Sequence, residues 1–169
     1  DDIDAPAKNF SNDFVCGEYN NQDKIKEFMS KVDVVTYEFE NIPYETLNEI
    51  NKTKPVLPKP SVNRIIQHRI AEKDFINNLN IRTTRYTFIN KRSEIDSVKD
   101  LLPGLLKTVT LGYDGKGQYS VNSLKSLDLI EIDYSKGYIL EKLVKLKKEI
   151  SIIITRFSDH KYEIYDPIE

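Results

Sequence analysis

The most informative stretch of the sequence reads Lys107-Thr108-Val109-Thr110-Leu111-Gly112-Tyr113-Asp114-Gly115-Lys116-Gly117-Gln118. Three of the six glycines of the chain lie in it, at positions 112, 115 and 117. Glycine permits positive φ angles and lets backbone N–H groups approach a ligand, and successive N–H groups can hold anionic oxygens. The lysines at 107 and 116 would add positive charge for a polyphosphate. The segment is therefore a candidate phosphate-binding loop.

A glycine-rich segment can also be the tip of a β-hairpin, where glycine serves the turn geometry and lysine keeps the tip hydrated. The spacing fits neither the P-loop pattern nor the dinucleotide-binding pattern, which also requires a helix after the glycines. The loop alone leaves the two interpretations about equally supported.

Other polar residues favour the phosphate interpretation. Arg69 and Lys73 are four residues apart in a predicted helix, so they share one face and can reach the same anion, although such a pair often lies on a solvated face. Glu141-Lys142-Leu143-Val144 follows a predicted strand, and Glu149 lies further along the chain. A carboxylate and free backbone groups at a strand end can bind an adenine, and a second carboxylate can bind ribose hydroxyls.

Outward from the loop, the sequence predicts an α/β fold whose second half is α+β. The first third alternates strands and helices in the manner of βαβ units, with strands at 13–16, 33–37 and 56–57 and helices at 23–32 and 44–50. Pro58-Lys59-Pro60 breaks regular structure and marks a candidate domain boundary. Beyond it we expect helices at 61–68, capped by Ser61, and at 71–78, then strands at 85–89, 138–140, 149–156 and 161–165.

Composition excludes several functional classes. The 169 residues include 25 basic and 27 acidic ones without a block of like charge, so no nucleic-acid partner is expected. Cys16 is the one cysteine and there are two histidines, which argues against a disulfide or a Cys/His zinc site. The apolar runs are too short to span a membrane, so no membrane partner is expected and a cytoplasmic protein is predicted.

In combination, the residues Arg69, Lys107, 112–118, 141–144 and Glu149 resemble the nucleotide site of the ATP-grasp superfamily. More narrowly, the run Asp33-Val34-Val35-Thr36-Tyr37-Glu38-Phe39-Glu40-Asn41-Ile42-Pro43, together with Lys107 and the glycine loop, resembles the 5-(carboxyamino)imidazole ribonucleotide synthetase family. The resemblance covers essentially the whole chain. It implies part of a Rossmann-like pre-ATP-grasp domain at 1–60, followed at 61–169 by part of an ATP-grasp domain with a lid at about 105–145.

The resemblance also implies roles for individual residues. Arg69 and Lys107 would contact the ATP phosphates, and a flexible loop would close over them, formed by Gly112, Tyr113, Asp114, Gly115, Lys116, Gly117 and Gln118. The adenine would bind a hinge formed by Glu141, Lys142, Leu143 and Val144, with Glu149 on the ribose. The aminoimidazole ribonucleotide would face Glu38, Tyr113, Asp114 and Lys116. No catalytic residue is assigned within the chain.

The family reaction uses ATP and Mg²⁺ to activate bicarbonate as carboxyphosphate, which then carboxylates the exocyclic amine of 5-aminoimidazole ribonucleotide. Such chemistry requires neutralised phosphoryl charge and exclusion of water. We expect the Mg²⁺ ligands beyond Glu169 and the family's first strand before Asp1, so this chain by itself is expected to be inactive. The family is commonly dimeric, which makes a homodimer an expected arrangement.

Other interpretations stay open. The family often has a basic pair where this chain has Thr108-Val109-Thr110, so one source of positive charge differs. Another ATP-grasp enzyme, such as a formate-dependent glycinamide ribonucleotide transformylase or a biotin-carboxylase-like enzyme, is the first alternative, although residues 36–43 and Tyr113-Asp114 favour the synthetase. A non-catalytic ATP-binding module is the second. An RNA-binding module is the third, and the balanced charge disfavours it.

Overall fold

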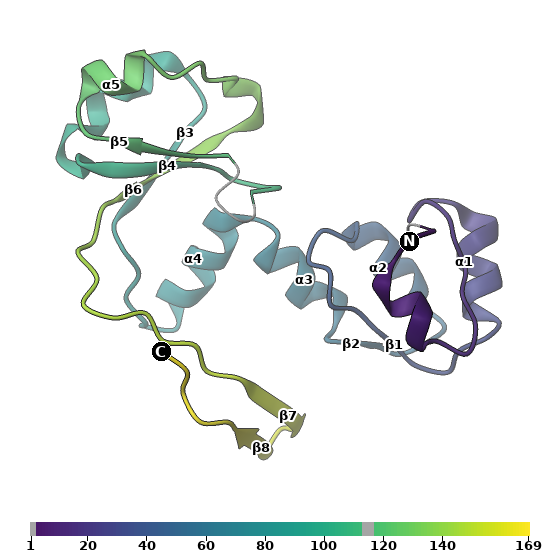
Figure 1. The fold of residues 1–169 in the computed structure, drawn as a ribbon. Helices are drawn as coiled ribbons and strands as arrows, with labels where there is room; N and C mark the ends of the chain where they lie inside the picture. The colour runs from purple at the N-terminus through teal and green to yellow at the C-terminus, as the bar shows by residue number, and fades with distance from the viewer. Residues whose placement is uncertain (1–2, 113–116) are drawn as a thin grey trace.

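The computed structural model describes residues 3–112 and 117–169 (Figure 1). Four loop residues with predicted roles, Tyr113, Asp114, Gly115 and Lys116, lie outside the described residues. Two helices, α3 (Pro60–Ile66) and α4 (Arg69–Asn78), run between an N-terminal unit and a four-stranded sheet. The predicted mixture of helix and sheet is confirmed.

The N-terminal unit is built on a short parallel sheet. Strand β1 (Val35–Thr36) pairs with β2 (Val56–Leu57), and α2 (Tyr44–Ile50) lies between them in the sequence. The 3₁₀-helix η1 (Pro6–Phe10) and α1 (Gln22–Met29) precede them. One apolar core joins α1, β1, α2 and β2 and is formed by Ile25, Val35, Leu47, Ile50 and Val56.

The ends of the N-terminal elements differ in part from the prediction. The strand predicted at 13–16 is wrong: these residues form no ladder, and the backbone N–H of Phe14 donates to the carboxylate of Asp13 instead. The helix predicted from residue 23 begins at Gln22, because the side chain of Asn21 accepts hydrogen bonds from the N–H groups of the first turn.

The helices after the boundary are also set by their first residues. The predicted cap at Ser61 is wrong, since α3 begins at Pro60, whose missing N–H and fixed φ suit the first helical position. Between α3 and α4 the helical conformation is interrupted, and His68 lies just before α4. Its Nδ1 accepts a hydrogen bond from the N–H of Ala71 at 3.3 Å and so caps α4.

The second sheet is antiparallel, in the order β3-β6-β4-β5. Its strands are β3 (Tyr86–Ile89), β4 (Gly104–Thr108), β5 (Gln118–Val121) and β6 (Tyr138–Lys142). In Figure 1 the sheet lies between α4 on one side and α5 (Leu124–Asp128) on the other. The 3₁₀-helices η2 (Arg92–Leu101) and η3 (Tyr134–Lys136) complete this unit.

Alternation along the strands divides the side chains of the sheet between its two faces. Leu106, Tyr138 and Leu140 belong to the core beneath η2 and α5, together with Ile89, Val98, Leu101, Val121 and Leu127. Lys107 and Glu141 are one position removed from these residues and therefore occupy the opposite face, towards α4. The same alternation that buries the core thus places a basic and an acidic side chain on the face of α4.

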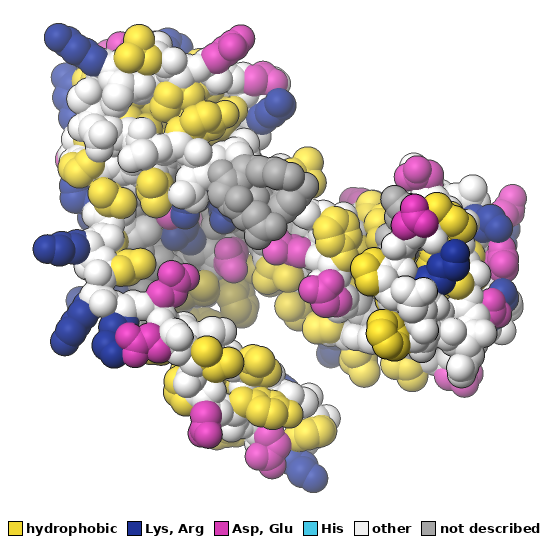
Figure 2. All heavy atoms as spheres, viewed as in Figure 1, with side chains coloured by type: hydrophobic (Ala, Val, Ile, Leu, Met, Phe, Trp, Pro, Cys, Tyr) yellow, Lys and Arg dark blue, Asp and Glu magenta, His cyan; other side chains and the backbone are white. Residues whose placement is uncertain are grey.

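The chain then leaves the sheet and forms a hairpin of β7 (Ile154–Ser158) and β8 (Lys161–Ile164). The strand predicted at 149–156 begins only at Ile154. Among the described residues, the segment before Ile154 has no continuous ladder to a partner strand, only one isolated bridge from Ser151 to Ile168. Apolar side chains remain exposed along the hairpin (Figure 2), among them Ile154, Phe157, Tyr162 and Ile164. No helix among the described residues is long and apolar enough to cross a bilayer.

Candidate functional site

Three elements bring one carboxylate and two lysines together on the α4 face of the sheet. Glu141 on β6 receives Lys107 of β4 at its Oε2 (2.9 Å) and Lys73 of α4 at its Oε1 (3.2 Å). In the ladder Lys107 lies opposite Ile139, and Glu141 lies opposite Leu105. The two side chains are therefore diagonal neighbours on one face, a separation that long side chains bridge.

The lysine cluster, Lys73–Glu141–Lys107, is largely withdrawn from solvent. The exposed fractions of the three side chains are 16%, 8% and 18% in that order. Burial by itself raises the pKa of Glu141, but the hydrogen bonds and charges of Lys107 and Lys73 outweigh it and lower the pKa below the usual value. The carboxylate is thus ionised, and the cluster carries a net positive charge.

Arg69, the first residue of α4, holds the entrance of the glycine loop. Its Nε donates to the carbonyl of Thr108 (3.1 Å), its Nη2 to that of Gly112 (2.6 Å), and its backbone N–H to that of Val109 (2.9 Å). Among the described residues these contacts use two of the five guanidinium N–H donors. Arg69 therefore fixes the loop base while keeping donors for an anion.

The described ends of the glycine loop show why glycine is required at one of them. Gly117 has φ +69°, and a Cβ there would lie 2.8 Å from Oγ1 of Thr108. Its carbonyl accepts the N–H of Thr108 at 2.9 Å, which closes the base of the loop. Leu111 also has a positive φ, 58°, although it is not glycine. Residues other than glycine rarely adopt this conformation because it is strained, and such strained residues are common in ligand-binding loops.

The segment that follows β1 is tied to the start of α4. Gln67 donates through Nε2 to the carbonyls of Glu40 (2.7 Å) and Ile42 (2.6 Å). Asn63 also donates to the carbonyl of Ile42. Glu38 is exposed in this segment, just past the carboxyl end of a parallel strand, where ligands bind α/β sheets.

The predicted hinge leaves the sheet at the end of β6. The backbone of Lys142 donates to the carbonyl of Arg85 and accepts from Thr84, and Leu143 donates to the carbonyl of Pro103. Within the described part of the chain, no hydrogen bond uses the N–H of Val144, which is half exposed. The predicted hinge therefore offers a free backbone donor three residues after Glu141 of the lysine cluster.

The structure does not connect Glu149 to this group. Glu149 is exposed in the irregular segment between β6 and β7 and makes no ion pair with a described residue. Gln118, by contrast, is the first residue of β5 and lies opposite Lys107. Of the predicted residues in the described part, Arg69, Lys107, Gly112, Gly117 and Gln118 thus lie at or next to the loop base, whereas residues 142–144 lie at the Gly104 end of β4 and are linked to the base through the Glu141–Lys107 ion pair.

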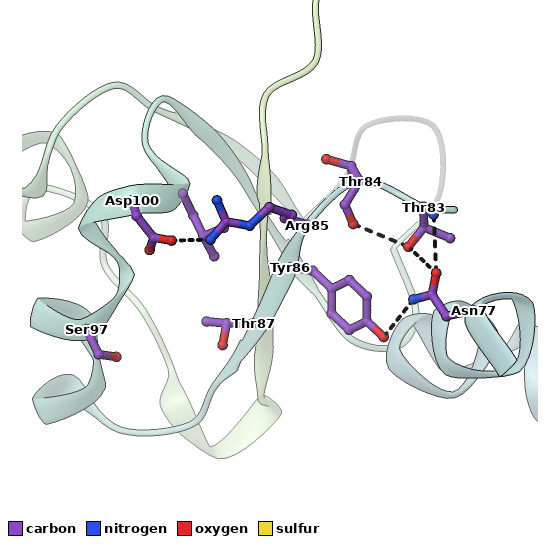
Figure 3. A pocket seen from close by; sticks show the side chains of 9 residues that line it. Asn77, Thr83, Thr84, Arg85, Tyr86, Thr87, Ser97 and Asp100 are labelled. Carbon is purple, nitrogen blue, oxygen red and sulfur yellow. Dashed lines mark hydrogen bonds and ion pairs between the residues drawn. The ribbon is translucent and has the colours of Figure 1, made fainter. Parts of the chain in front are cut away.

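Two open cavities lie outside the lysine cluster, and none of its three residues lines either of them. One, of about 390 Å³, joins the N-terminal unit to the loop base and is lined by Asn41, Tyr44, Arg64, Gln67, Thr110 and Leu111, among others. The other, of about 400 Å³, lies beside β3 (Figure 3), where Tyr86 receives a hydrogen bond from Asn77. The first lies between the segment that follows β1 and the entrance of the glycine loop.

The donor set does not fit a resident metal. Over residues 3–112 and 117–169, no three His, Cys, Asp or Glu side chains gather as a metal site. Within these ranges the one buried carboxylate is that of Glu141, and both of its oxygens bind lysines. The described side chains therefore offer no set of ligands for Mg²⁺.

Comparison with known families agrees with this geometry. The family model of the ribonucleotide synthetase preATP-grasp domain matches residues 1–67, and that of the ATP-grasp domain matches residues 74–169. The second match covers more than half of the chain and includes the cluster, the glycine loop and the hinge. The chain belongs to the ATP-grasp family. The predicted superfamily is thereby confirmed.

Relatives within the ATP-grasp family carry names from purine synthesis. The N5-carboxyaminoimidazole ribonucleotide synthase of Brucella melitensis is 31% identical over 170 residues, covering 98% of this chain and 47% of the relative. The bifunctional purine synthesis protein purC/E of Dictyostelium discoideum is 34% identical over 148 residues, covering 83% of this chain and 15% of the relative.

Solved structures show the same likeness. An ADP complex of N5-carboxyaminoimidazole ribonucleotide synthetase has a TM-score of 0.90 at 28% identity, covering 98% of this chain and 45% of that one. The Staphylococcus aureus synthetase with ADP has a TM-score of 0.89 at 25% identity, with the same coverage. The chain therefore spans less than half the length of these similar proteins, and the narrower resemblance to the synthetase family is confirmed.

Lys73 has a partner that the sequence did not predict: its spacing from Arg69 indicated only a shared helix face from which both could reach the same anion. The spacing from Arg69 did place both on one helix face, and the structure confirms that this face is not solvated. What the sequence lacked was the partner: Glu141 lies 68 positions away and meets Lys73 only through the strand order of the sheet.

Proposed function

We propose that this chain is the ATP-binding part of an N5-carboxyaminoimidazole ribonucleotide synthase. The full protein would convert 5-aminoimidazole ribonucleotide, bicarbonate and ATP into the N5-carboxylated nucleotide, ADP and phosphate. The observation that carries the proposal is the net positive lysine cluster at the base of the glycine loop, in a chain similar over 98% of its length to a synthase of that name. A buried cation beside backbone donors suits a transferring phosphoryl group.

The individual roles are part of the same proposal. Lys107 and Arg69 bind the phosphates, residues 112–118 close over them, and residues 141–144 bind the adenine, which the free N–H of Val144 supports. Glu149 binds the ribose once its exposed segment approaches the nucleotide.

The second substrate would occupy the cavity between the two units. Glu38 contacts 5-aminoimidazole ribonucleotide together with Tyr113, Asp114 and Lys116 of the loop. The cavity of about 390 Å³ supports this placement, because it is lined from both the segment after β1 and the loop entrance. We place the boundary between the two units near residue 60, immediately before α3.

The test is a coupled assay of ADP release by the full-length protein. We expect turnover with 5-aminoimidazole ribonucleotide plus bicarbonate, and none with glycinamide ribonucleotide plus formate. Lys107→Met should lower kcat/KM by about a hundredfold, as the loss of one charge contact to a transferring phosphoryl group does. Turnover with formate instead would favour the transformylase, and ATP binding without any turnover would favour a non-catalytic module.

Mg²⁺, a homodimer, a cytoplasmic location and the absence of a nucleic-acid partner stay predictions. Each follows from the family resemblance or the composition.

A further inference from the structure

Lys73 is a partly buried cation for which the sequence predicts only that it could reach the same anion as Arg69, and to which the family resemblance gives no role. Its side chain is 16% exposed, and its Nζ binds the oxygen of Glu141 that Lys107 does not use. We propose that Lys73 is a positioning residue for Lys107: by sharing Glu141, it keeps the cluster net positive and leaves Lys107 available to a nucleotide phosphate. The inference rests on the proposed function, because it takes Lys107 as a phosphate ligand.

The charges of the cluster explain why a second lysine is needed. Without Lys73, the Glu141 carboxylate would stand 2.9 Å from Lys107 as a neutral pair. A phosphate approaching such a pair is repelled by the carboxylate about as strongly as the ammonium attracts it. With Lys73 present, the two lysines exceed the one carboxylate by one positive charge, so the site attracts an anion.

The contacts of Lys73 show that it is held independently of any ligand. Its Nζ lies 5.5 Å from the centroid of the Tyr86 ring, a cation–π distance. The hydroxyl of Tyr86 donates to Asp74, and Asn77 donates to that hydroxyl at 3.4 Å (Figure 3 shows the Asn77 bond). Tyr86 is thus anchored on α4, the helix that carries Lys73. The ring of Tyr86 holds the ammonium of Lys73 beside Oε1 of Glu141.

Among the described residues, the ammonium of Lys107 makes fewer contacts than that of Lys73. Its ammonium has three donors, and among the described residues its one ion pair is with Glu141. Two donors therefore remain for a ligand. Lys73 supports the carboxylate from one side, and Lys107 faces the loop base from the other.

The experiment measures ADP and adenosine binding by calorimetry on the full-length protein. Lys73→Gln keeps a donor for Glu141 without the charge, whereas Lys73→Arg keeps the charge. We expect Lys73→Gln to weaken ADP about fivefold, the effect of one screened unit charge, and to leave adenosine unchanged. Lys73→Arg should bind ADP as the wild type does. Lys125→Gln, on exposed α5, makes the same change in net charge and should have no effect.

A double-mutant cycle separates positioning from direct contact. If Lys73 acts through Lys107, Lys73→Gln should weaken ADP binding less in a Lys107→Met background than in the wild type, because only the field of Glu141 on the phosphates then remains. Additive effects would show that Lys73 binds phosphate by itself and would overturn the inference. Equal weakening of ADP and adenosine would show a merely structural role and would overturn it too.

Two further outcomes distinguish failure of this inference from failure of the proposed function. Unchanged ADP binding by Lys73→Gln would overturn this inference while leaving the proposed function intact, whereas a wild type that binds no ADP would overturn both. Thermal melting checks each variant for folding. If Lys73→Gln does not fold, Lys73→Met, which keeps the apolar stem, takes its place with the same expectations.

Discussion

Replacing Glu141 with glutamine should destabilise the chain by about 3 kcal/mol at neutral pH. Glutamine keeps the shape of the side chain but removes the charge that holds Lys107 at 2.9 Å and Lys73 at 3.2 Å. At an effective dielectric constant of about 20 each contact attracts by about 5 kcal/mol, and the dehydration of the three groups offsets most of that attraction. Glutamine leaves two half-buried ammonium groups without a counter-charge. Removal of one partner of such a pair typically lowers the free energy of unfolding by about 3 kcal/mol.

The assay is urea unfolding of the wild type and of Glu141→Gln, followed across pH. The pKa of Glu141 in the folded chain lies below its ordinary value of 4.5. Its contribution to the free energy of unfolding is therefore fully present above pH 4.5 and is lost as the pH falls through the lower, folded pKa. The difference between wild type and variant should consequently be largest at neutral pH and shrink in acid.

Glu131→Gln provides the matched control, because Glu131 is exposed and has no ion pair among the described residues. It should change the free energy of unfolding by less than about 0.5 kcal/mol. A Glu141→Gln variant as stable as this control at neutral pH would refute the reasoning. So would a difference from wild type that stays constant down to pH 3.

Three further substitutions test the fold around the site. Gly117→Ala should cost on the order of 1–3 kcal/mol in a thermal melt, because alanine is strained at φ +69° and its Cβ would meet Thr108; no change would show that the loop base relaxes freely. Asn21→Ala should lose about 1 kcal/mol in urea unfolding with the cap of α1, and a neutral result would contradict that role. Leu106→Ala, fully buried in the sheet core, should cost about 2–5 kcal/mol in urea unfolding, and a cost below about 1 kcal/mol would contradict its burial.

Local signals in the sequence predicted most elements of the fold. The helix at 44–50 and the strand at 56–57 have the predicted bounds, because apolar spacing and a preceding proline act within a few residues. The strand at 13–16 failed because β-rich composition does not supply a partner: a strand exists only where another strand pairs with it. Pairing is a long-range property that a short window of sequence does not contain.

The candidate site shows the same division. The glycines, Arg69 and Lys107 were recognisable because loop and helix spacing are local. The ion pairs of Glu141 with the two lysines depend on the position of β6 between β3 and β4. These strands are neighbours in the sheet, although β6 is far from both of them in the sequence. Sequence reasoning therefore supplied the candidate residues but not the ion pairs that join Glu141 to Lys107 and Lys73.

One turn of chain holds the two halves of the site in register. Gln67 binds the carbonyls of the segment after β1, His68 caps α4, and Arg69 binds the carbonyls of the loop entrance. Because these three residues are consecutive, the start of one helix contacts both the segment that carries Glu38 and the entrance of the glycine loop. The family models divide the chain within a few residues of this turn, so the hydrogen bonds of Gln67 and Arg69 link the parts that the two models match.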